Sequence, residues 1–193
     1  IYSKEDLIIN GNGTLNVNAG YRNGIKSTDD CIIVSGTLNI TSTEDGIIGK
    51  DLCGVVAGDI NINAGSDGIK STYDTDTTKG NVIIEGGNIT IKASNDGIQA
   101  ENILVINDGA INIKTNNGAA DTTQTHIDNM DMGRGGFGFN NNKTTTTTDD
   151  TSESRKGIKA GNMLIINDGD ITIDSDDDSV HCTSVLYLYV GTI

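Results

Sequence analysis

The sequence contains no proline and no tryptophan, and aromatic residues make up only 4% of its 193 residues. So few aromatic side chains argue against a flat aromatic strip of the kind that grips crystalline cellulose. With two histidines and no G-x-S-x-G motif, a serine hydrolase is a poor candidate. No apolar run approaches the length of a membrane-spanning helix, which predicts that the chain does not insert into a membrane.

Basic residues are also scarce. The 13 lysines and arginines face 27 acidic residues, which leaves a formal net charge of −14. A surface this acidic repels nucleic-acid phosphates and anionic lipid headgroups, so we expect neither as a partner. It attracts cations instead, and a bound cation can reverse the local sign of charge.

A repeat runs through most of the chain. The tripeptide Asp-Gly-Ile occurs at 45–47, 67–69 and 96–98, with variants at 23–25, 156–158 and 178–180. Most of the steps are 22 residues, whereas the step from 67 to 96 has 7 extra residues and the step from 96 to 156 has 38 extra. A fixed period of this size predicts a solenoid.

Within a repeat, two apolar-x-apolar pairs flank a glycine, as in Cys31, Ile33, Gly36, Leu38 and Ile40. Alternation with period two predicts strands that bury one face. A single coil cannot bury that face alone, so like residues of successive coils should stack in columns roughly 4.8 Å apart. The glycine column predicts a turn that needs positive φ or has no room for a Cβ atom.

These features predict an all-β fold: a right-handed, single-stranded parallel β-helix with about 22 residues per coil and about six to seven coils. The hand is inferred from the usual right-handed parallel crossover. We expect residues 1–193 to form a single domain that is a fragment of a longer chain, with a long loop insertion at about 117–155. We interpret the insertion as a tolerated loop rather than a flap over a binding face.

Stacked coils place aspartates of like position above one another. Carboxylates about 5 Å apart repel by about 1 kcal/mol or more, and a hard cation with oxygen ligands, Ca²⁺ above all, is the natural compensation. The alternative is that each aspartate only caps its own turn. The predicted calcium ligands are Asp45, Asp67 and Asp96, with Asp29, Asp51, Asp74 and Asp178.

A second column follows each tripeptide and contains Lys26, Lys70 and Lys159, with His181 at its end. These lysines are candidates to contact sugar carboxylates or hydroxyls. They can equally neutralise the neighbouring aspartates, which is the interpretation that the acidic surroundings favour. No residue is predicted to be catalytic.

Two of the three cysteines, Cys31 and Cys53, occupy the same position in adjacent coils. The expected spacing allows a disulfide, but we favour stacked free thiols. Cys182 has no evident partner, and the absence of a C-x-x-C motif argues against a zinc or redox site.

The segments "NGIKSTDD", "DGIKSTYDTD", "EGGNITIKASNDGIQAEN" and "KGIKAGNMLIINDGDITIDSDDDSVH" resemble a family of bacterial carbohydrate-binding β-helix domains, found in secreted proteins of anaerobic plant-fibre-degrading bacteria. The resemblance covers nearly the whole chain apart from the insertion. It implies a pectate-lyase-like fold, bound calcium, and binding of cellulose or pectic polysaccharide without established catalytic activity. It carries Asp45, Asp67, Asp96 and Asp178 over to the family's acidic motif, whereas Asn23 and Lys156 depart from it.

We therefore expect a non-catalytic, calcium-containing module of a secreted or cell-surface protein that binds plant cell-wall glycan. The shortage of aromatic residues favours acidic, pectin-like chains held through calcium. Two alternatives stay open: a polysaccharide lyase or hydrolase of the same architecture, and a structural stalk or adhesin that only spaces other domains of a longer surface protein.

Overall fold

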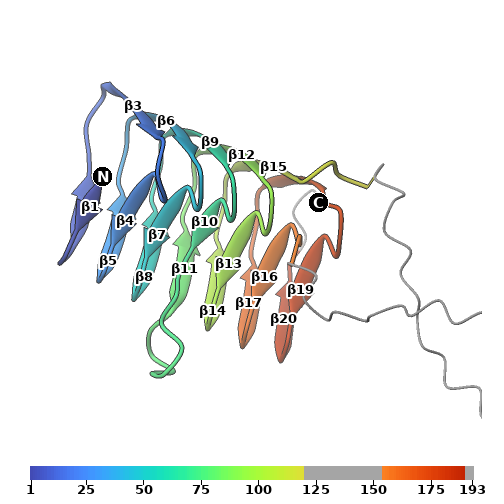
Figure 1. The fold of residues 1–193 in the computed structure, drawn as a ribbon. Helices are drawn as coiled ribbons and strands as arrows, with labels where there is room; N and C mark the ends of the chain where they lie inside the picture. The colour runs from blue at the N-terminus through green and yellow to red at the C-terminus, as the bar shows by residue number, and fades with distance from the viewer. Residues whose placement is uncertain (120–153, 190–193) are drawn as a thin grey trace, which may run out of the picture.

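The computed structural model describes residues 1–119 and 154–189, and these form a parallel β-helix of strands β1 to β20. Each coil contributes one strand to each of three sheets, except the last described coil, which contributes only to two, and successive coils stack along one axis (Figure 1). Within these described residues there is no helix, and hence none with the length and apolar character needed to cross a membrane.

Sheet A contains β1 and the short strand that begins at the last residue of each tripeptide. Its strands are β1 (Tyr2–Ser3), β4 (Ile25–Ser27), β7 (Ile47–Gly49), β10 (Ile69–Lys70), β13 (Ile98–Ala100), β16 (Ile158–Ala160) and β19 (Val180–Cys182).

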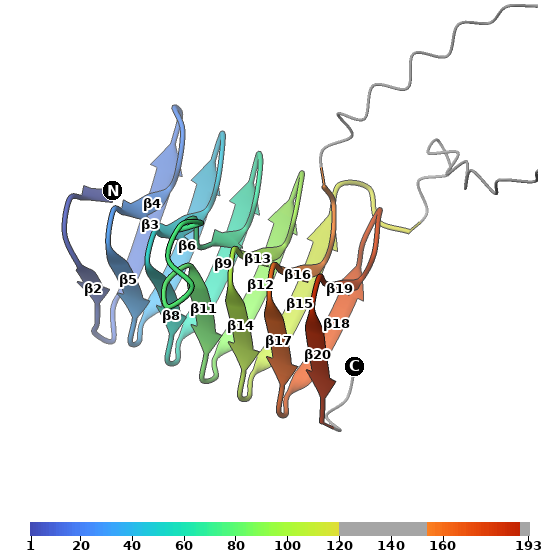
Figure 2. The same cartoon turned by 90° about the horizontal axis from the view of Figure 1, so that it is seen from below.

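Sheet B contains the first apolar pair of each repeat. Its strands are β2 (Leu7–Ile9), β5 (Asp30–Ile33), β8 (Leu52–Val55), β11 (Asn81–Ile84), β14 (Ile103–Ile106), β17 (Met163–Ile166) and β20 (Val185–Leu188). Figure 2 shows these strands as one row from β2 to β20.

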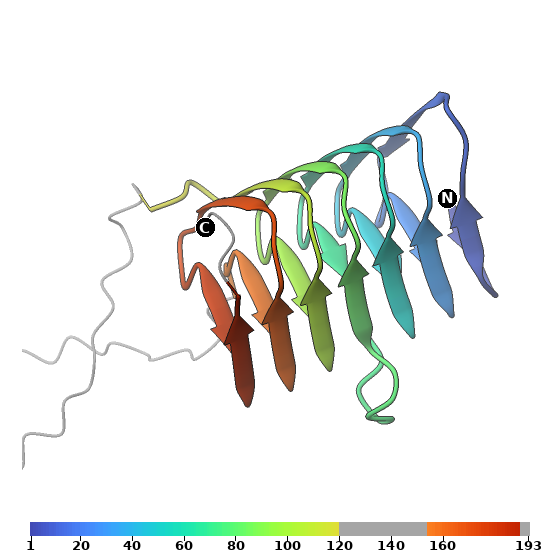
Figure 3. The ribbon, with the colours of Figure 1, turned by 180° about the vertical axis from the view of Figure 1, so that it is seen from behind.

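Sheet C contains the second apolar pair. Its strands are β3 (Thr14–Ala19), β6 (Thr37–Ser42), β9 (Asp59–Ala64), β12 (Asn88–Ala93), β15 (Ala110–Thr115) and β18 (Asp170–Asp174). The view from behind in Figure 3 shows the same succession of coils from the N-terminus to the C-terminal coil.

The predicted register is confirmed in the interior of the solenoid. Ile47 pairs with Ile69, and Ile69 pairs with Ile98, so the 7 extra residues leave the coil and the register resumes. Ile98 pairs with Ile158 across 60 positions. The predicted insertion at about 117–155 thus falls between β15 and β16, and its residues 120–153 lie outside the described part of the chain.

The N-terminal coil departs from the 22-residue period. Leu7 pairs with Cys31 and Tyr2 pairs with Lys26, both 24 positions apart, and Thr14 pairs with Thr37 at 23. The extra residues lie in the turns of this coil, because its strands still pair residue by residue with those of the next coil.

The core consists of aliphatic columns that run the length of the solenoid. Ile33, Val55, Ile84, Ile106 and Ile166 form one such column in sheet B, and each has no exposed side-chain surface. Burial of a side chain of this size contributes about 1.5–3 kcal/mol, so the stacked columns supply the main stabilising term.

The two cysteines stack as predicted. Cys31 and Cys53 are neighbours in register, fully buried and free, so the thiol interpretation is confirmed over the disulfide. Hydrogen bonding to Cys31, together with burial, raises the pKa of the Cys53 thiol well above its ordinary value.

The turn glycines fulfil both conditions that the sequence suggested. Gly58 has φ of 120°, and a Cβ atom there would lie 2.7 Å from the carbonyl oxygen of Gly36 in the preceding coil. This turn therefore needs glycine for conformation as well as for space.

Candidate functional site

The predicted lysine column lies on the outer face of sheet A. Lys26, Ile48, Lys70, Gln99, Lys159 and His181 follow one another in register. Lys70 is bound to Asp67 at 2.6 Å, and Lys159 lies 3.3 Å from Asp96. Among the described residues Lys26 has no ion pair, so neutralisation accounts for two of the three lysines and leaves Lys26 available.

The aspartates of the tripeptides stack as predicted, with Asp45, Asp67 and Asp96 one above another. Their carboxylates accept hydrogen bonds from the backbone of the next coil: Asp67 N–H donates to Asp45 at 3.1 Å and Asp96 N–H donates to Asp67 at 3.0 Å. Lys156 N–H donates to Asp96 at 2.7 Å. The aspartates thus cap the neighbouring coil, whereas the alternative weighed from sequence was that each caps its own turn.

Burial and neighbouring charges shift the pKa values of Asp67 and Lys70 at this column. Burial raises the pKa of Asp67, against the lowering effect of Lys70, and the charges of Asp45 and Asp96 raise it further. Burial is the largest single effect on the pKa of Lys70 and lowers it, but the charge and hydrogen bond of Asp67, together with the charges of Asp45 and Glu101, outweigh it and the net shift is upward. Each oxygen of Asp67 and of Asp96 already has an N–H or ammonium partner, so a cation at these two carboxylates would compete with those partners. Calcium at this column stays a prediction.

A different group of carboxylates converges at the turn between sheets A and B. Ligand oxygens of Asp6, Asp29 and Asp30 all lie within 4.8 Å of one another, and we call these residues the acidic cluster. Asp30 N–H donates to the Asp6 carboxylate at 3.3 Å, which ties the first two coils together at this point. Three convergent carboxylates are a donor set that suits a hard cation such as Ca²⁺.

Asp51 extends the acidic cluster into the next coil. Hydrogen bonding to Asp51 raises the pKa of Asp29, and burial and the charges of Asp51, Asp6 and Asp30 add to the shift. Burial and the charges of Asp6 and Asp51 raise the pKa of Asp30. Lys79, from the insertion between β10 and β11, forms an ion pair with Asp51. The cluster therefore holds excess negative charge that one ammonium does not balance.

The last two predicted calcium ligands lie apart from this cluster. Asp74 is exposed on the insertion between β10 and β11. Asp178 is exposed at the C-terminal coil, 3.1 Å from His181 Nδ1 and 3.7 Å from Lys156. Their roles as calcium ligands stay predictions.

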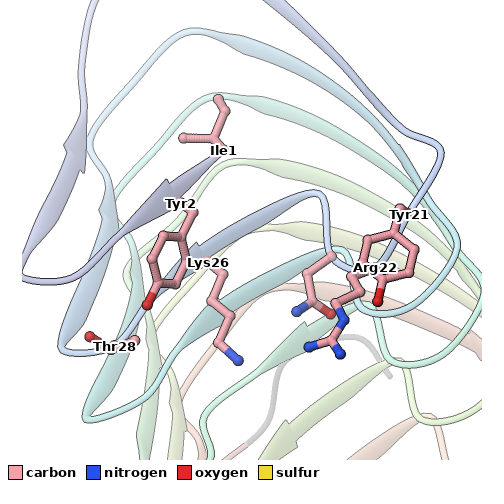
Figure 4. A pocket seen from close by; sticks show the side chains of 7 residues that line it. Ile1, Tyr2, Tyr21, Arg22, Lys26 and Thr28 are labelled. Atoms are coloured by element: carbon pink, nitrogen blue, oxygen red, sulfur yellow. The ribbon is translucent and has the colours of Figure 1, made fainter.

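A cleft of about 520 Å³ opens at the N-terminal end of the outer face of sheet A. It is lined by Ile1, Tyr2, Tyr21, Arg22, Asn23, Lys26 and Thr28. Figure 4 shows Tyr2 and Lys26 on one side and Arg22 and Tyr21 on the other, with the two cationic groups directed towards the space between them. None of these described lining residues is acidic, although the chain as a whole carries a net charge of −14.

Arg22 occupies an uncommon backbone conformation at the rim of this cleft. Its φ is 63°, a region that costs a residue with a Cβ atom of order 1 kcal/mol or more and recurs at ligand-binding sites. The Arg22 carbonyl holds it there by accepting hydrogen bonds from Glu44 N–H at 3.1 Å and the Thr43 hydroxyl at 3.3 Å. The guanidinium lies 5.3 Å from the centre of the Tyr21 ring, a cation–π contact.

The sequence identified Lys26 but not the other cleft residues, and Asp29 and Asp51 but not Asp6 and Asp30. The reason is the same in both cases: the 24-residue first coil brings Tyr2 beside Lys26 and Asp6 beside Asp30, positions that a 22-residue period separates. A signal was present, since Leu7 aligned on Cys31 places the two preceding aspartates together.

Three comparisons place the chain among known proteins. A curated protein of Acetivibrio thermocellus described as "Carbohydrate-binding domain-containing protein" is 45% identical over 40 residues, which are 21% of this chain and 14% of that protein. A solved structure, described as the polysaccharide lyase-like protein from C. thermocellum in a gadolinium derivative, matches with a TM-score of 0.61 and 25% identity. That match covers 100% of this chain and 55% of the other, so the chain spans about half of that structure's length.

The third comparison covers the whole chain. The model of the family described as "Carbohydrate-binding domain-containing protein" matches residues 1–193. The chain therefore belongs to this family of carbohydrate-binding domain-containing proteins.

Proposed function

We propose that this chain is a non-catalytic polysaccharide-binding module of a secreted or cell-surface protein, and that it binds a plant cell-wall glycan of the pectic or cellulosic class. The observation that carries the proposal is the cleft with Tyr2, Tyr21, Arg22 and Lys26. Tyr2 is 59% and Tyr21 is 77% exposed, so both rings are free to pack against the apolar faces of sugars.

Within that proposal, the charge of the cleft favours the pectic class. Arg22 and Lys26 are the cations that face the cleft, and a guanidinium can hold a carboxylate through two parallel hydrogen bonds. Elsewhere on sheet A the lysines are bound to aspartates, so a uronate chain finds its charge partners at this end.

Affinity measurements on polygalacturonate test the cleft. Arg22→Asn retains a residue type that tolerates positive φ while it removes the guanidinium, and Lys26→Gln removes the ammonium. We expect each to weaken binding about tenfold, equivalent to about 1.4 kcal/mol. Lys92→Gln is the matched control, because Lys92 is exposed on sheet C and its loss changes net charge equally. Unchanged affinity in both cleft variants would remove the cleft from the proposal.

If the wild-type chain binds neither polygalacturonate nor cellulose, with calcium present, the proposed function itself fails. The remaining hypothesis is then the stalk, in which the solenoid only spaces other domains of a longer protein.

We also propose that Ca²⁺ binds at the acidic cluster of Asp6, Asp29 and Asp30, with Asp51 at its edge. The convergent carboxylates and the raised pKa of Asp29 support this, since a divalent cation relieves the same repulsion that a shared proton relieves. The solved neighbour is described as a gadolinium derivative, and a lanthanide ion shares calcium's preference for oxygen ligands.

Thermal unfolding with calcium and with chelator tests this ion. At 100 times the dissociation constant, calcium should stabilise the native chain by about 2.7 kcal/mol. Asp29→Asn should abolish the response, whereas Asp59→Asn, a charge change on the exposed face of sheet C, should preserve it. A wild-type melting temperature that chelator leaves unchanged would count against the site.

A lyase of the same architecture is the second candidate. The solved neighbour is described as polysaccharide lyase-like, and Thr28, which lines the cleft with Arg22 and Lys26, directly precedes Asp29 of the acidic cluster. Unsaturated oligogalacturonides released from polygalacturonate would establish this activity, and their absence across pectic substrates would dismiss it.

A further inference from the structure

The outer face of sheet B carries an aliphatic ladder that neither the core nor the cleft uses. One outward residue from each strand contributes to it, in register: Ile8, Ile32, Ile83, Val105, Ile165 and Tyr187, with Gly54 between Ile32 and Ile83. Ile8 is 63% exposed and Tyr187 is 45% exposed; the four aliphatic residues between them are half-buried, and Gly54 is buried and leaves a gap in the ladder. We call this ladder the sheet B strip.

Residues beside the strip widen it. Leu52, Ile103 and Met163 flank it on one side and Val56, 45% exposed, flanks it on the other. Strands with apolar residues on both faces are typical of sheets covered on both sides, whereas the outward residues of sheet C are mostly Asn, Thr and Asp. A partly exposed apolar face that continues across successive coils is a candidate interaction surface.

Amide ladders border the strip on both sides. Asn102 donates to Asn81 at 3.0 Å and Asn162 donates to Asn102 at 3.2 Å along one edge. Along the other edge Asn107 donates to Glu85 and Asn167 donates to Asn107, both at 2.7 Å. The surface is therefore apolar along its middle, and amides lie along both margins, but Asn102 is only 6% exposed and has little amide surface to offer a ligand.

Tyrosines extend this surface at the C-terminal coil. Tyr187 continues the aliphatic ladder after Ile165, and its ring stacks with that of Tyr189 at 6.5 Å between centroids and 12° between planes. Two exposed rings in this arrangement form a platform in line with the strip.

The dimensions and the charge of the strip decide what fits it. Seven strands at ~4.8 Å spacing and about four residues of width give a patch roughly 30 Å by 13 Å, about 400 Å². A stable second copy would need about 800 Å² per partner. From β8 to β20 the outward residues of sheet B are uncharged except Glu85, so a polyanionic chain finds no cation there.

We propose that the sheet B strip is a docking surface for an uncharged polysaccharide, separate from the cleft. Pyranose rings have apolar faces and hydroxyl rims, and these match the aliphatic ladder with its amide margins. The proposal rests on the carbohydrate-binding function proposed above, and it adds a second surface that spans successive coils.

Binding to swollen cellulose, used as the uncharged probe, tests the strip. Val105→Lys places a charge at its centre and Tyr187→Ala removes the ring of the platform, and each should weaken retention about tenfold. Asn112→Lys is the matched control, since Asn112 is exposed on sheet C of the same coil and should leave retention unchanged. Val105→Lys should also leave polygalacturonate binding unchanged, because the cleft is untouched.

Several results would refute the proposal that the sheet B strip binds polysaccharide. The first is cellulose retention that neither variant alters. The second is a wild-type chain that binds polygalacturonate but no uncharged glycan, a result that would leave the proposed function intact. A wild-type dimer that Val105→Lys converts to a monomer, with glycan binding unaltered, would show that a second copy covers this face. A wild-type chain that binds no glycan would refute both proposals.

Discussion

The aspartate column offers the sharpest test of what holds successive coils in register. Asp96 is 1% exposed, accepts Lys156 N–H at 2.7 Å, and lies 3.3 Å from Lys159. Asp96→Ala leaves that N–H without its acceptor and Lys159, whose side chain is 30% exposed, without its ion-pair partner, which should cost about 3 kcal/mol. Asp96→Asn keeps an acceptor for Lys156 N–H and loses only the charge, so it should cost about half as much.

Thermal and urea unfolding followed by circular dichroism measure both losses. In a chain of this size 1 kcal/mol corresponds to about 2–4 °C, so Asp96→Ala should lower Tm by roughly 10 °C. Asp170→Ala, an exposed aspartate on sheet C, is the control and should change stability by less than about 0.5 kcal/mol. The reasoning fails if Asp96→Asn is as damaging as Asp96→Ala, or if chelator removes the difference between wild type and variant. The second result would support the calcium role of this column, which stays a prediction from sequence.

Three further outcomes follow from the structure. Because folding raises the pKa of Asp29, protonation of this carboxyl stabilises the fold below its ordinary pKa of 3.8, and that stabilisation is lost as pH rises through the pKa in the folded state. In pH-dependent unfolding without calcium, the wild-type free energy of unfolding should therefore fall over that pH window relative to Asp29→Asn. In thiol titration of the native chain, half-exposed Cys182 should react first and buried Cys31 and Cys53 only on unfolding; three equal rates would contradict this. Gly68→Ala should destabilise the chain by about 2 kcal/mol in chemical denaturation, since its Cβ would lie 2.5 Å from the Gly97 oxygen; an unchanged midpoint would refute the contact.

Most of the architecture was predictable because the solenoid repeats its own constraints. Once Asp45, Asp67 and Asp96 were aligned, the register of sheets A, B and C followed, and the structure confirms it through pairs such as Ile69 with Ile98. The 29- and 60-residue steps did not make the register harder to predict, since an insertion at a turn leaves the pairing of the stacked strands unchanged.

The candidate sites were less predictable, because they depend on departures from the period. The first coil and its turns, where the spacing is 24, supply Tyr2, Tyr21 and Arg22 of the cleft and the Asp6 carboxylate. The partners of Asp67 and Asp96 were equally hidden: spacing places carboxylates in a column but does not show which N–H groups point at them.

The sequence by itself determined the repeat, the inward columns, the turn glycines and the aspartate and lysine columns. Each is a local sequence pattern that recurs in every coil, and coils that stack at a fixed spacing place its members above one another. Only the tertiary structure decided which charges are already paired, where carboxylates converge with too few cationic side chains to balance them, and which outward residues of successive coils together form a cleft or a strip. Those properties depend on side-chain direction and on the length of each turn, and a shift of two residues in one coil changes which side chains meet.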